Sequence, residues 1–328
     1  MDYNRHNAKD YAREHLTGIW AAALTPFTED LAIDEDGFRS NIHHWVDELG
    51  IEGLFISGKQ GEFCAMTLEE RKRTFDLAVE ATAGAGQTIM SCSDPNMDVV
   101  IDLARHAETI GADYIVVHAP MLHFAKAQDE TLLAYYRTIA ESVDIGIALW
   151  SHPDSGYLMS PELCNRLADI DNIVAIKYSV PRDMYVELSE LASDRIQVST
   201  ASETEWLDNI IELDWRLYLC SSPPFLLQTA RDRRMLDYTR AAFEGRVDEA
   251  REISRSLDPV RVMVQADGDT AAEALMGTRP PEKPHAHQKY WQELLGQAGG
   301  RVRAPLLELT DAERAATRNA FEACGLLR

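Results

Sequence analysis

The stretch NIVAIKYSV, residues 172–180, places a lysine inside an apolar run that has the composition of a buried β-strand. Three apolar residues precede Lys177 and a tyrosine follows it. An ionised ammonium group is costly in a dry strand unless it is paired, or unless its pKa falls until it is neutral. Lys177 therefore either extends from the strand end to water, pairs with a carboxylate, or is a neutral amine that can attack a carbonyl carbon.

Seven other short apolar runs lie along the chain, and longer amphipathic segments separate them. With the run around Lys177, the predicted strands cover residues 18–24, 53–57, 88–93, 114–120, 146–152, 173–179, 196–202 and 216–222. Strands that alternate with helices pair in parallel, and continuous apolar strands are typical of a sheet buried on both faces. The count of eight favours a closed (β/α)8 barrel over an open doubly wound sheet. Neither GxGxxG nor GxxxxGK[ST] follows a strand, which argues against the nucleotide-binding forms of the open sheet.

About a hundred residues after the eighth run look helical, which is more than a last barrel helix needs. We expect an N-terminal arm at 1–17, the barrel at 18–245 and a C-terminal helical extension at 246–328, with the proline-rich TRPPEKPH at 278–285 as a connection.

Two helix starts have capping signals. Thr67 followed by Glu70 predicts a capping box, and Asp36 is expected to cap the helix predicted over 36–50.

The composition limits the classes of partner. The chain has 328 residues, 45% of them hydrophobic, and 32 Lys and Arg against 54 Asp and Glu give a net charge of −22. Such a charge repels phosphate backbones and anionic membranes, so we expect neither as a partner. No signal peptide and no apolar run of membrane-spanning length are recognised, which predicts a soluble cytoplasmic protein.

No metal site or cofactor motif is recognised. Five widely spaced cysteines without a CxxC motif indicate reduced thiols rather than a disulfide framework or a zinc site. His43 and His44 are adjacent on a predicted helix and do not share a face, and His285 and His287 lie in a proline-flanked loop. We therefore expect no metal and no cofactor.

The segment GKQGEF, residues 58–63, follows the second predicted strand directly. Gly58 and Gly61 permit a tight turn whose backbone N–H groups form a nest for a carboxylate, and Lys59 can add a positive charge. The alternative is an ordinary glycine turn with a solvated lysine.

Three segments together resemble the dihydrodipicolinate synthase / N-acetylneuraminate lyase superfamily. They are GKQGEFCAMTLEER (58–71), ALWSHPDSG (148–156) and NIVAIKYS (172–179), and the chain's opening at 18–38 and its end at 299–327 are similar to the same family. The resemblance implies a (β/α)8 barrel with a helical C-terminal extension, commonly assembled as a homotetramer. It also implies class I chemistry without a cofactor, in which Lys177 forms a Schiff base with pyruvate or another 2-oxo acid.

The resemblance also points to residues that would contact the substrate, and several of them depart from the family pattern. The predicted substrate-binding residues are Lys59, Gln60, Trp150, His152, Ser202 and Ser222. Lys59-Gln60 stands where the family has two hydroxyl residues that hold the carboxylate and relay protons.

Trp150 stands at the family tyrosine, and its indole N–H cannot act as a general acid or base at neutral pH. Leu122 stands near the position of a second family tyrosine. His152 or His123 is a candidate to replace the lost proton relay. HPDSG, at 152–156, has no counterpart of the arginine that binds a second carboxylate, so we do not expect dihydrodipicolinate synthase activity itself.

Three functions remain open from the sequence. The first is a lyase of the aldolase type that makes or cleaves a C–C bond between a 2-oxo acid and an aldehyde. The second is a hydro-lyase or deaminase that uses the same lysine imine, or an aromatic hydratase-aldolase, for which Trp150, Phe63 and Phe124 are candidate lining residues. The third is a ligand-binding barrel without turnover.

Overall fold

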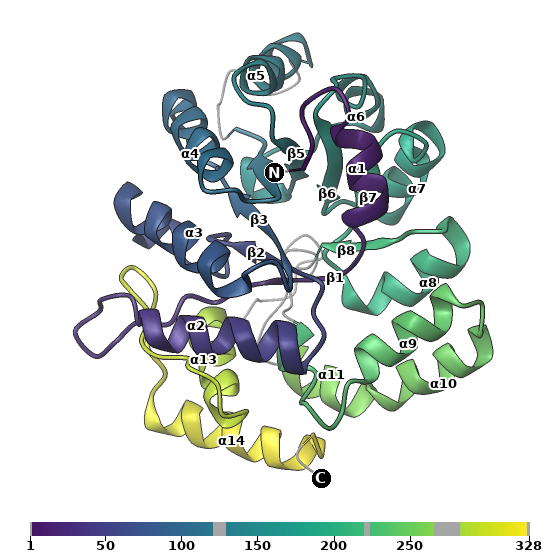
Figure 1. Cartoon of the computed structure of the whole chain (residues 1–328). Helices are drawn as coiled ribbons and strands as arrows, with labels where there is room; N and C mark the ends of the chain where they lie inside the picture. Colours follow the sequence, from purple (N-terminus) through teal and green to yellow (C-terminus); the bar gives the residue numbers. More distant parts are fainter. Residues whose placement is uncertain (1, 121–128, 220–223, 266–282, 327–328) are drawn as a thin grey trace. The chain divides into compact units, whose positions relative to one another are not determined.

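The computed structural model describes residues 2–120, 129–219, 224–265 and 283–326 (Figure 1). Eight strands alternate with helices along the chain and belong to one eight-stranded sheet. The fold is a (β/α)8 barrel with helices after its last strand, as the sequence predicts. The chain divides into two compact units, Met1–Gly18 with Gln87–Leu219 and Ile19–Gly86 with Cys220–Arg328.

The first unit contains six strands with helices outside them (Figure 1). Its strands are β3 (Gln87–Ser91), β4 (Tyr114–His118), β5 (Gly146–Ser151), β6 (Ile173–Tyr178), β7 (Gln197–Ser199) and β8 (Leu217–Leu219). Its helices are α1 (Ala8–His15), α4 (Met97–Thr109), α5 (Asp129–Glu141), the short η4 (Pro153–Ser155), α6 (Pro161–Leu167), α7 (Arg182–Ala192) and α8 (Glu203–Leu213). Strands β3 to β7 pair successively and in parallel. All residues of β5 and β6 are buried, as expected for parallel strands covered on both faces.

The predicted N-terminal arm packs on this unit. The Tyr3 ring stacks on Tyr11 and Tyr114, with ring centroids 4.7 and 6.0 Å apart. The Tyr3 hydroxyl accepts a hydrogen bond of 2.8 Å from the backbone N–H of Gly146, at the start of β5. The boundaries expected for the arm, the barrel and the extension stay predictions.

The second unit contains the first two strands and the C-terminal helices. Its elements are β1 (Gly18–Ala22), α2 (Glu35–His43), the π-helical η1 (His44–Glu48), β2 (Gly53–Ile56), η2 (Phe63–Ala65), α3 (Leu68–Thr82), η5 (Pro224–Leu226), α9 (Arg234–Phe243), α10 (Val247–Ser256), α11 (Asp258–Gln265), α13 (Pro284–Leu294) and α14 (Asp311–Cys324). Strands β1 and β2 pair in parallel, with Trp20 opposite Gly53. A Cβ atom at Gly53 would lie 2.1 Å from the Trp20 ring, so only glycine fits there.

The helix starts of this unit test the capping signals. Thr67 and Glu70 form the predicted capping box of α3. The prediction for Asp36 is wrong, because the carboxylate of Asp34 accepts the N–H of Gly37 and α2 therefore begins earlier.

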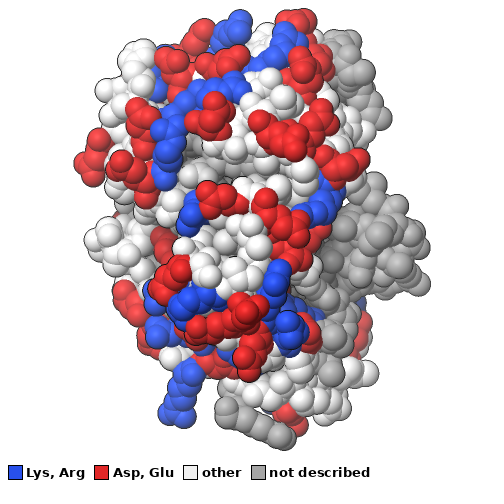
Figure 2. All heavy atoms as spheres, turned by 90° about the vertical axis from the view of Figure 1, so that its right-hand side faces the viewer, with Lys and Arg blue, Asp and Glu red and all other residues white. Residues whose placement is uncertain are grey.

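Charged side chains of both signs lie on the surface of the protein. On the face drawn in Figure 2, the basic side chains lie beside acidic ones. No helix among the described residues is long and apolar enough to cross a membrane.

Candidate active site

A row of four side chains crosses the first unit near the carboxyl ends of its strands. The strand register places His118 of β4 opposite Trp150 of β5, Trp150 opposite Lys177 of β6, and Lys177 opposite Ser199 of β7. Because partner residues of adjacent parallel strands project from the same face, these four side chains share one face of the sheet. Catalytic groups of barrel enzymes come from this end of the strands.

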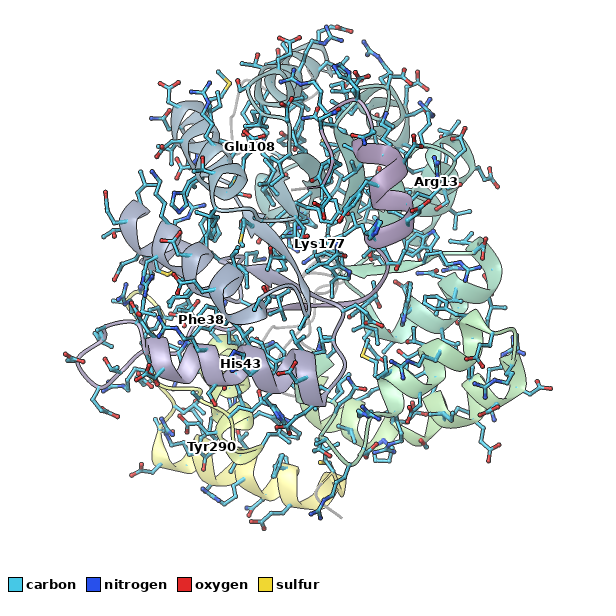
Figure 3. The ribbon with its side chains drawn as sticks, in the orientation of Figure 1. Arg13, Phe38, His43, Glu108, Lys177 and Tyr290 are labelled. Carbon is cyan, nitrogen blue, oxygen red and sulfur yellow. The ribbon has the colours of Figure 1, made fainter. Side chains whose placement is uncertain are left out.

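Lys177 is buried, with 1% of its surface exposed. Figure 3 shows it among the strands, whereas Arg13 and Glu108 of the same unit lie on outer helices. Its Nζ atom lies 4.8 Å from the centroid of the Trp150 ring. An aromatic face attracts a cation, so Trp150 can stabilise positive charge on this nitrogen by about 0.5–2 kcal/mol.

Two histidine rings pack around the same tryptophan. His118 meets Trp150 edge-on at a centroid distance of 4.7 Å, and the ring of His152 lies 6.2 Å from Trp150 and 6.3 Å from His118. The His118 Nδ1 atom lies 2.7 Å from the carbonyl oxygen of Ala119. Since a carbonyl only accepts, Nδ1 carries the proton, and Nε2 of the neutral ring is left as the basic nitrogen.

His152 is held by Asp154. It precedes η4, and its Nδ1 lies 3.2 Å from the backbone nitrogen of Asp154. The Asp154 carboxylate lies 3.2 Å from the same Nδ1 and can pair with the ring when it is protonated. One imidazole therefore gives its Nδ1 proton to a carbonyl, and the other lies beside a carboxylate that can stabilise its protonated form.

Ser199 anchors the end of the row. It is fully buried, and its Oγ accepts the backbone N–H of Leu219 at 2.7 Å, which joins β7 to β8. Tyr178, next to Lys177, points to the other face, where its hydroxyl donates to Met159 O at 2.6 Å. Burial raises the pKa of Tyr178, so this hydroxyl stays protonated.

The predicted site residues have different locations. Lys177, Trp150 and His152 lie together in the first unit. Ser202 lies beyond β7, which ends at Ser199, and precedes α8, where its half-buried side chain has its hydroxyl 3.1 Å from that of Thr204.

Three other predicted positions fall outside the described residues. They are Ser222, of the substrate-binding set, Leu122, which stands near a family tyrosine, and His123, a candidate for the proton relay. His118 and Ser199 were not among the predicted site residues. Their only sequence signal is a polar side chain at or just after a strand end, which many residues share.

Lys59 and Gln60 lie in the second unit, half-buried in the turn after β2. Thr25 donates its hydroxyl proton to the carbonyl of Gly61 at 2.9 Å, and the Glu62 N–H bonds back to Lys59 O at 3.0 Å. The turn is thus tightly constrained, as the two glycines predict.

Phe63, a candidate aromatic lining residue, is half-buried, with the Arg71 guanidinium carbon 5.2 Å from its ring centroid. Phe124 lies outside the described residues. Within the described part of the chain, no three His, Cys, Asp or Glu side chains form a group that could hold a metal ion.

Comparisons with known proteins agree on one family. The model of the dihydrodipicolinate synthetase family matches residues 15–272. The 4-hydroxy-tetrahydrodipicolinate synthase of Methanothrix thermoacetophila is 27% identical over 310 residues, which cover 92% of this chain and 95% of that protein. An uncharacterized DapA-like lyase of Pyrococcus abyssi is 30% identical over 200 residues, which cover 60% of this chain and 66% of the relative.

A solved structure has the same fold. YagE, a prophage protein of E. coli K12 belonging to the dihydrodipicolinic acid synthase family and crystallised with pyruvate, matches with a TM-score of 0.80 at 23% identity. The match covers 94% of this chain and 99% of YagE. The family match spans most of the chain and agrees with the resemblance seen in its motifs. The chain belongs to the dihydrodipicolinate synthetase family.

Proposed function

We propose that this protein is a Schiff-base lyase of the aldolase type, in which Lys177 attacks a 2-oxo acid and a C–C bond is made or cleaved. The observation that carries the proposal is the buried amine of Lys177, in one row with Trp150 and His118. Burial favours the neutral, nucleophilic amine, while the indole face offsets part of the cost of positive charge. The Pyrococcus relative is named a lyase, which agrees with this class of reaction.

The chemistry follows from the amine. The neutral amine of Lys177, the substrate ketone and one proton taken from solvent give an iminium ion and one water molecule. For cleavage, the hydroxyl group on C4 loses its proton, the C3–C4 bonding pair moves toward the iminium nitrogen, and an aldehyde leaves from an enamine. C3 then takes up a proton, and water hydrolyses the iminium to release pyruvate and Lys177.

Two proton transfers in this sequence need a base and an acid. We propose that His118, through its basic Nε2, acts as the base and that His152, as an imidazolium paired with Asp154, acts as the acid, because Trp150 cannot exchange a proton at neutral pH. In the reverse, bond-forming direction the two histidines exchange these roles.

The substrate carboxylate is the other recognition element. Lys59 and Gln60 are proposed to bind it, since a cation and an amide N–H₂ both donate to carboxylate oxygens. Ser202 and Ser222 stay predictions for the same role. Because HPDSG contains no arginine to bind a second carboxylate, we do not propose dihydrodipicolinate synthase activity, and experiment must identify the aldehyde.

A homotetramer is proposed from the resemblance, and light scattering would test it.

Borohydride trapping tests the function. The protein is incubated with pyruvate, reduced, digested and analysed by peptide mass spectrometry. We expect a reduced pyruvyl adduct on Lys177 and none in Lys177→Ala. If an adduct forms only with a larger 2-oxo acid, the substrate is a different 2-oxo acid, but the Schiff-base chemistry proposed for Lys177 is unchanged. No adduct with any 2-oxo acid would contradict the proposal.

Product analysis with a panel of aldehydes, aromatic ones included, separates the alternatives. Release of pyruvate together with an aldehyde identifies an aldolase. Loss of water or ammonia without C–C cleavage identifies a hydro-lyase or deaminase.

A further inference from the structure

A second buried lysine lies in the second unit, on α13. The Lys289 side chain is 1% exposed, and its Nζ lies 2.5 Å from Oε1 of Glu62, whose side chain is fully buried. The same Nζ donates to the carbonyl of Arg301 at 2.6 Å and lies 4.4 Å from the centroid of the Phe27 ring. Glu62 is thereby paired inside the protein rather than at its surface.

Glu62 closes the turn that contains Lys59 and Gln60. Its backbone has a φ of 58°, a left-handed conformation that is uncommon for residues other than glycine. Its N–H donates to Lys59 O at 3.0 Å, and its Oε2 accepts the backbone N–H of Arg303 at 3.0 Å. Both carboxylate oxygens are thus used, and they hold a strained backbone position in place.

His285 holds the other end of the same turn. It lies one helical turn before Lys289 on α13, and its Nε2 is 2.9 Å from the carbonyl oxygen of Lys59. Because a carbonyl only accepts, Nε2 carries the proton. The Nδ1 atom is buried and has no hydrogen-bond partner among the described residues. One helix therefore holds the turn at both ends, through His285 at the backbone carbonyl of Lys59 and through Lys289 at the carboxylate of Glu62.

We propose that Lys289 is a positioning residue, which acts through Glu62 and with His285 to hold residues 59–62 in the conformation that binds the substrate carboxylate. This inference rests on the proposed function, in which Lys59 and Gln60 bind that carboxylate. A buried carboxylate requires a counter-charge. Without Lys289, Glu62 must take up a proton or turn toward water, and either change releases the turn. Lys289 itself contacts no substrate atom in this role.

A double variant separates positioning from stability. Glu62→Gln with Lys289→Met removes both charges together and leaves no buried ion behind, so the fold should survive. Lys283→Met is the matched control. Lys283 lies just before the same helix and pairs with Glu313 of α14 at 2.6 Å, and no contact with the turn is recorded for it among the described residues.

Hydrogen exchange of the peptide that contains residues 57–66 is the first measurement, and it does not depend on activity. We expect at least tenfold faster exchange in the double variant and wild-type exchange in Lys283→Met. His285→Leu, which keeps the ion pair, should give a smaller acceleration, and His285→Gln, which can still donate to Lys59 O, should restore protection. Wild-type exchange in the double variant would overturn the inference, as would equal acceleration in the Lys283 control.

Steady-state kinetics with the 2-oxo acid that wild-type protein traps is the second measurement. We expect KM to rise at least tenfold in the double variant while kcat changes less than threefold, because the chemistry of Lys177 is unaltered. An unchanged KM alongside faster exchange would overturn the role in substrate binding. Failure of wild-type protein to form any adduct would instead contradict the proposed function, and the exchange experiment would still decide whether Lys289 positions the turn.

Discussion

Each of the two units buries a lysine, and the contacts that the structure describes for the two side chains differ. Lys289 is 1% exposed and lies 2.5 Å from a carboxylate, with a carbonyl oxygen as a further acceptor. Lys177 is equally buried, but the contacts described for it are with the face of an indole ring, beside two imidazoles. Burial lowers the pKa of Lys289, and the Glu62 carboxylate opposes that effect.

The difference shows what a buried amine can do. An ammonium group that is held by a carboxylate and a carbonyl is a fixed structural cation, since its donors are occupied. A lysine that serves as a nucleophile must instead exchange between amine, ammonium and iminium, and an aromatic face such as that of Trp150 attracts the two charged forms. Depth of burial alone therefore does not distinguish the two roles.

Replacement of Lys177 by methionine should give the largest effect on activity. The methionine fills a similar volume but cannot form the imine, so we expect turnover to fall by at least about 10⁴-fold. The free energy of unfolding should stay within about 1.5 kcal/mol of wild type, because the methionine side chain fills a volume similar to that of lysine. Steady-state assays and urea unfolding check the two parts. If the variant keeps its turnover and its wild-type affinity for substrate, Lys177 is not the nucleophile, and the two lysines do not differ in role as argued here.

Replacement of Lys289 alone should give the largest effect on stability. Lys289→Met leaves the Glu62 carboxylate buried without its partner, so we expect a loss of about 3–5 kcal/mol in the free energy of unfolding. Addition of Glu62→Gln should recover most of that loss. Urea unfolding of the single and double variants measures the coupling. If the single variant is as stable as wild type, the pair is not the fixed ion pair described here.

Loss of the Trp150 ring should have a moderate effect. Trp150→Leu keeps an apolar side chain beside Lys177 but removes the aromatic face, which is worth about 0.5–2 kcal/mol to a cation. We expect formation of the iminium with a 2-oxo acid to weaken by about two- to thirtyfold. Borohydride trapping at graded substrate concentrations measures this change. Tyr290, whose ring lies 4.8 Å from the Arg314 guanidinium carbon, is a control aromatic residue in the second unit, and Tyr290→Leu should leave trapping unchanged.

The sequence predicts the strands well, and it makes Lys177 conspicuous, for one physical reason. Buried parallel strands are continuous apolar runs, so a charged residue within one of them is conspicuous, and the predicted run at 173–179 corresponds to Ile173–Tyr178 in the structure. The family resemblance is confirmed by the match over residues 15–272.

Other features depend on where an element ends or on contacts distant in the chain. Strand β7 ends at Ser199, three residues before Ser202, and no local signal distinguishes the two serines. Asp34 caps α2 because the helix begins one residue before Asp36, and both are equally good capping residues. The pairing of Glu62 with Lys289 joins two segments far apart in the sequence, and neither segment contains a pattern that predicts its partner.

The smallest expected effect is a dependence of stability on pH that comes from His285 in the second unit. Burial lowers the pKa of this imidazole below its usual value near 6.5, and the nearby Lys289 acts in the same direction, whereas Glu62 and the bond to Lys59 O oppose the shift. The unfolded chain therefore binds a proton at a higher pH than the folded protein does, so His285 contributes stability above about pH 6.5 that is lost as the pH falls toward its folded-state pKa. Its contribution to the slope cannot exceed about 1.4 kcal/mol per pH unit.

Urea unfolding between pH 8 and pH 5 measures this slope. His285→Gln, which keeps a donor for Lys59 O but cannot take up a proton, should flatten the curve. His6, an exposed histidine of the first unit that lies 3.0 Å from Asp171, provides a control, and His6→Gln should leave the slope nearly unchanged. A steeper curve in His285→Gln would mean that the buried imidazole is already protonated in the folded protein. The cluster around Glu62 would then hold two cations rather than one, and the fixed charge of the second unit would have to be shared between Lys289 and His285.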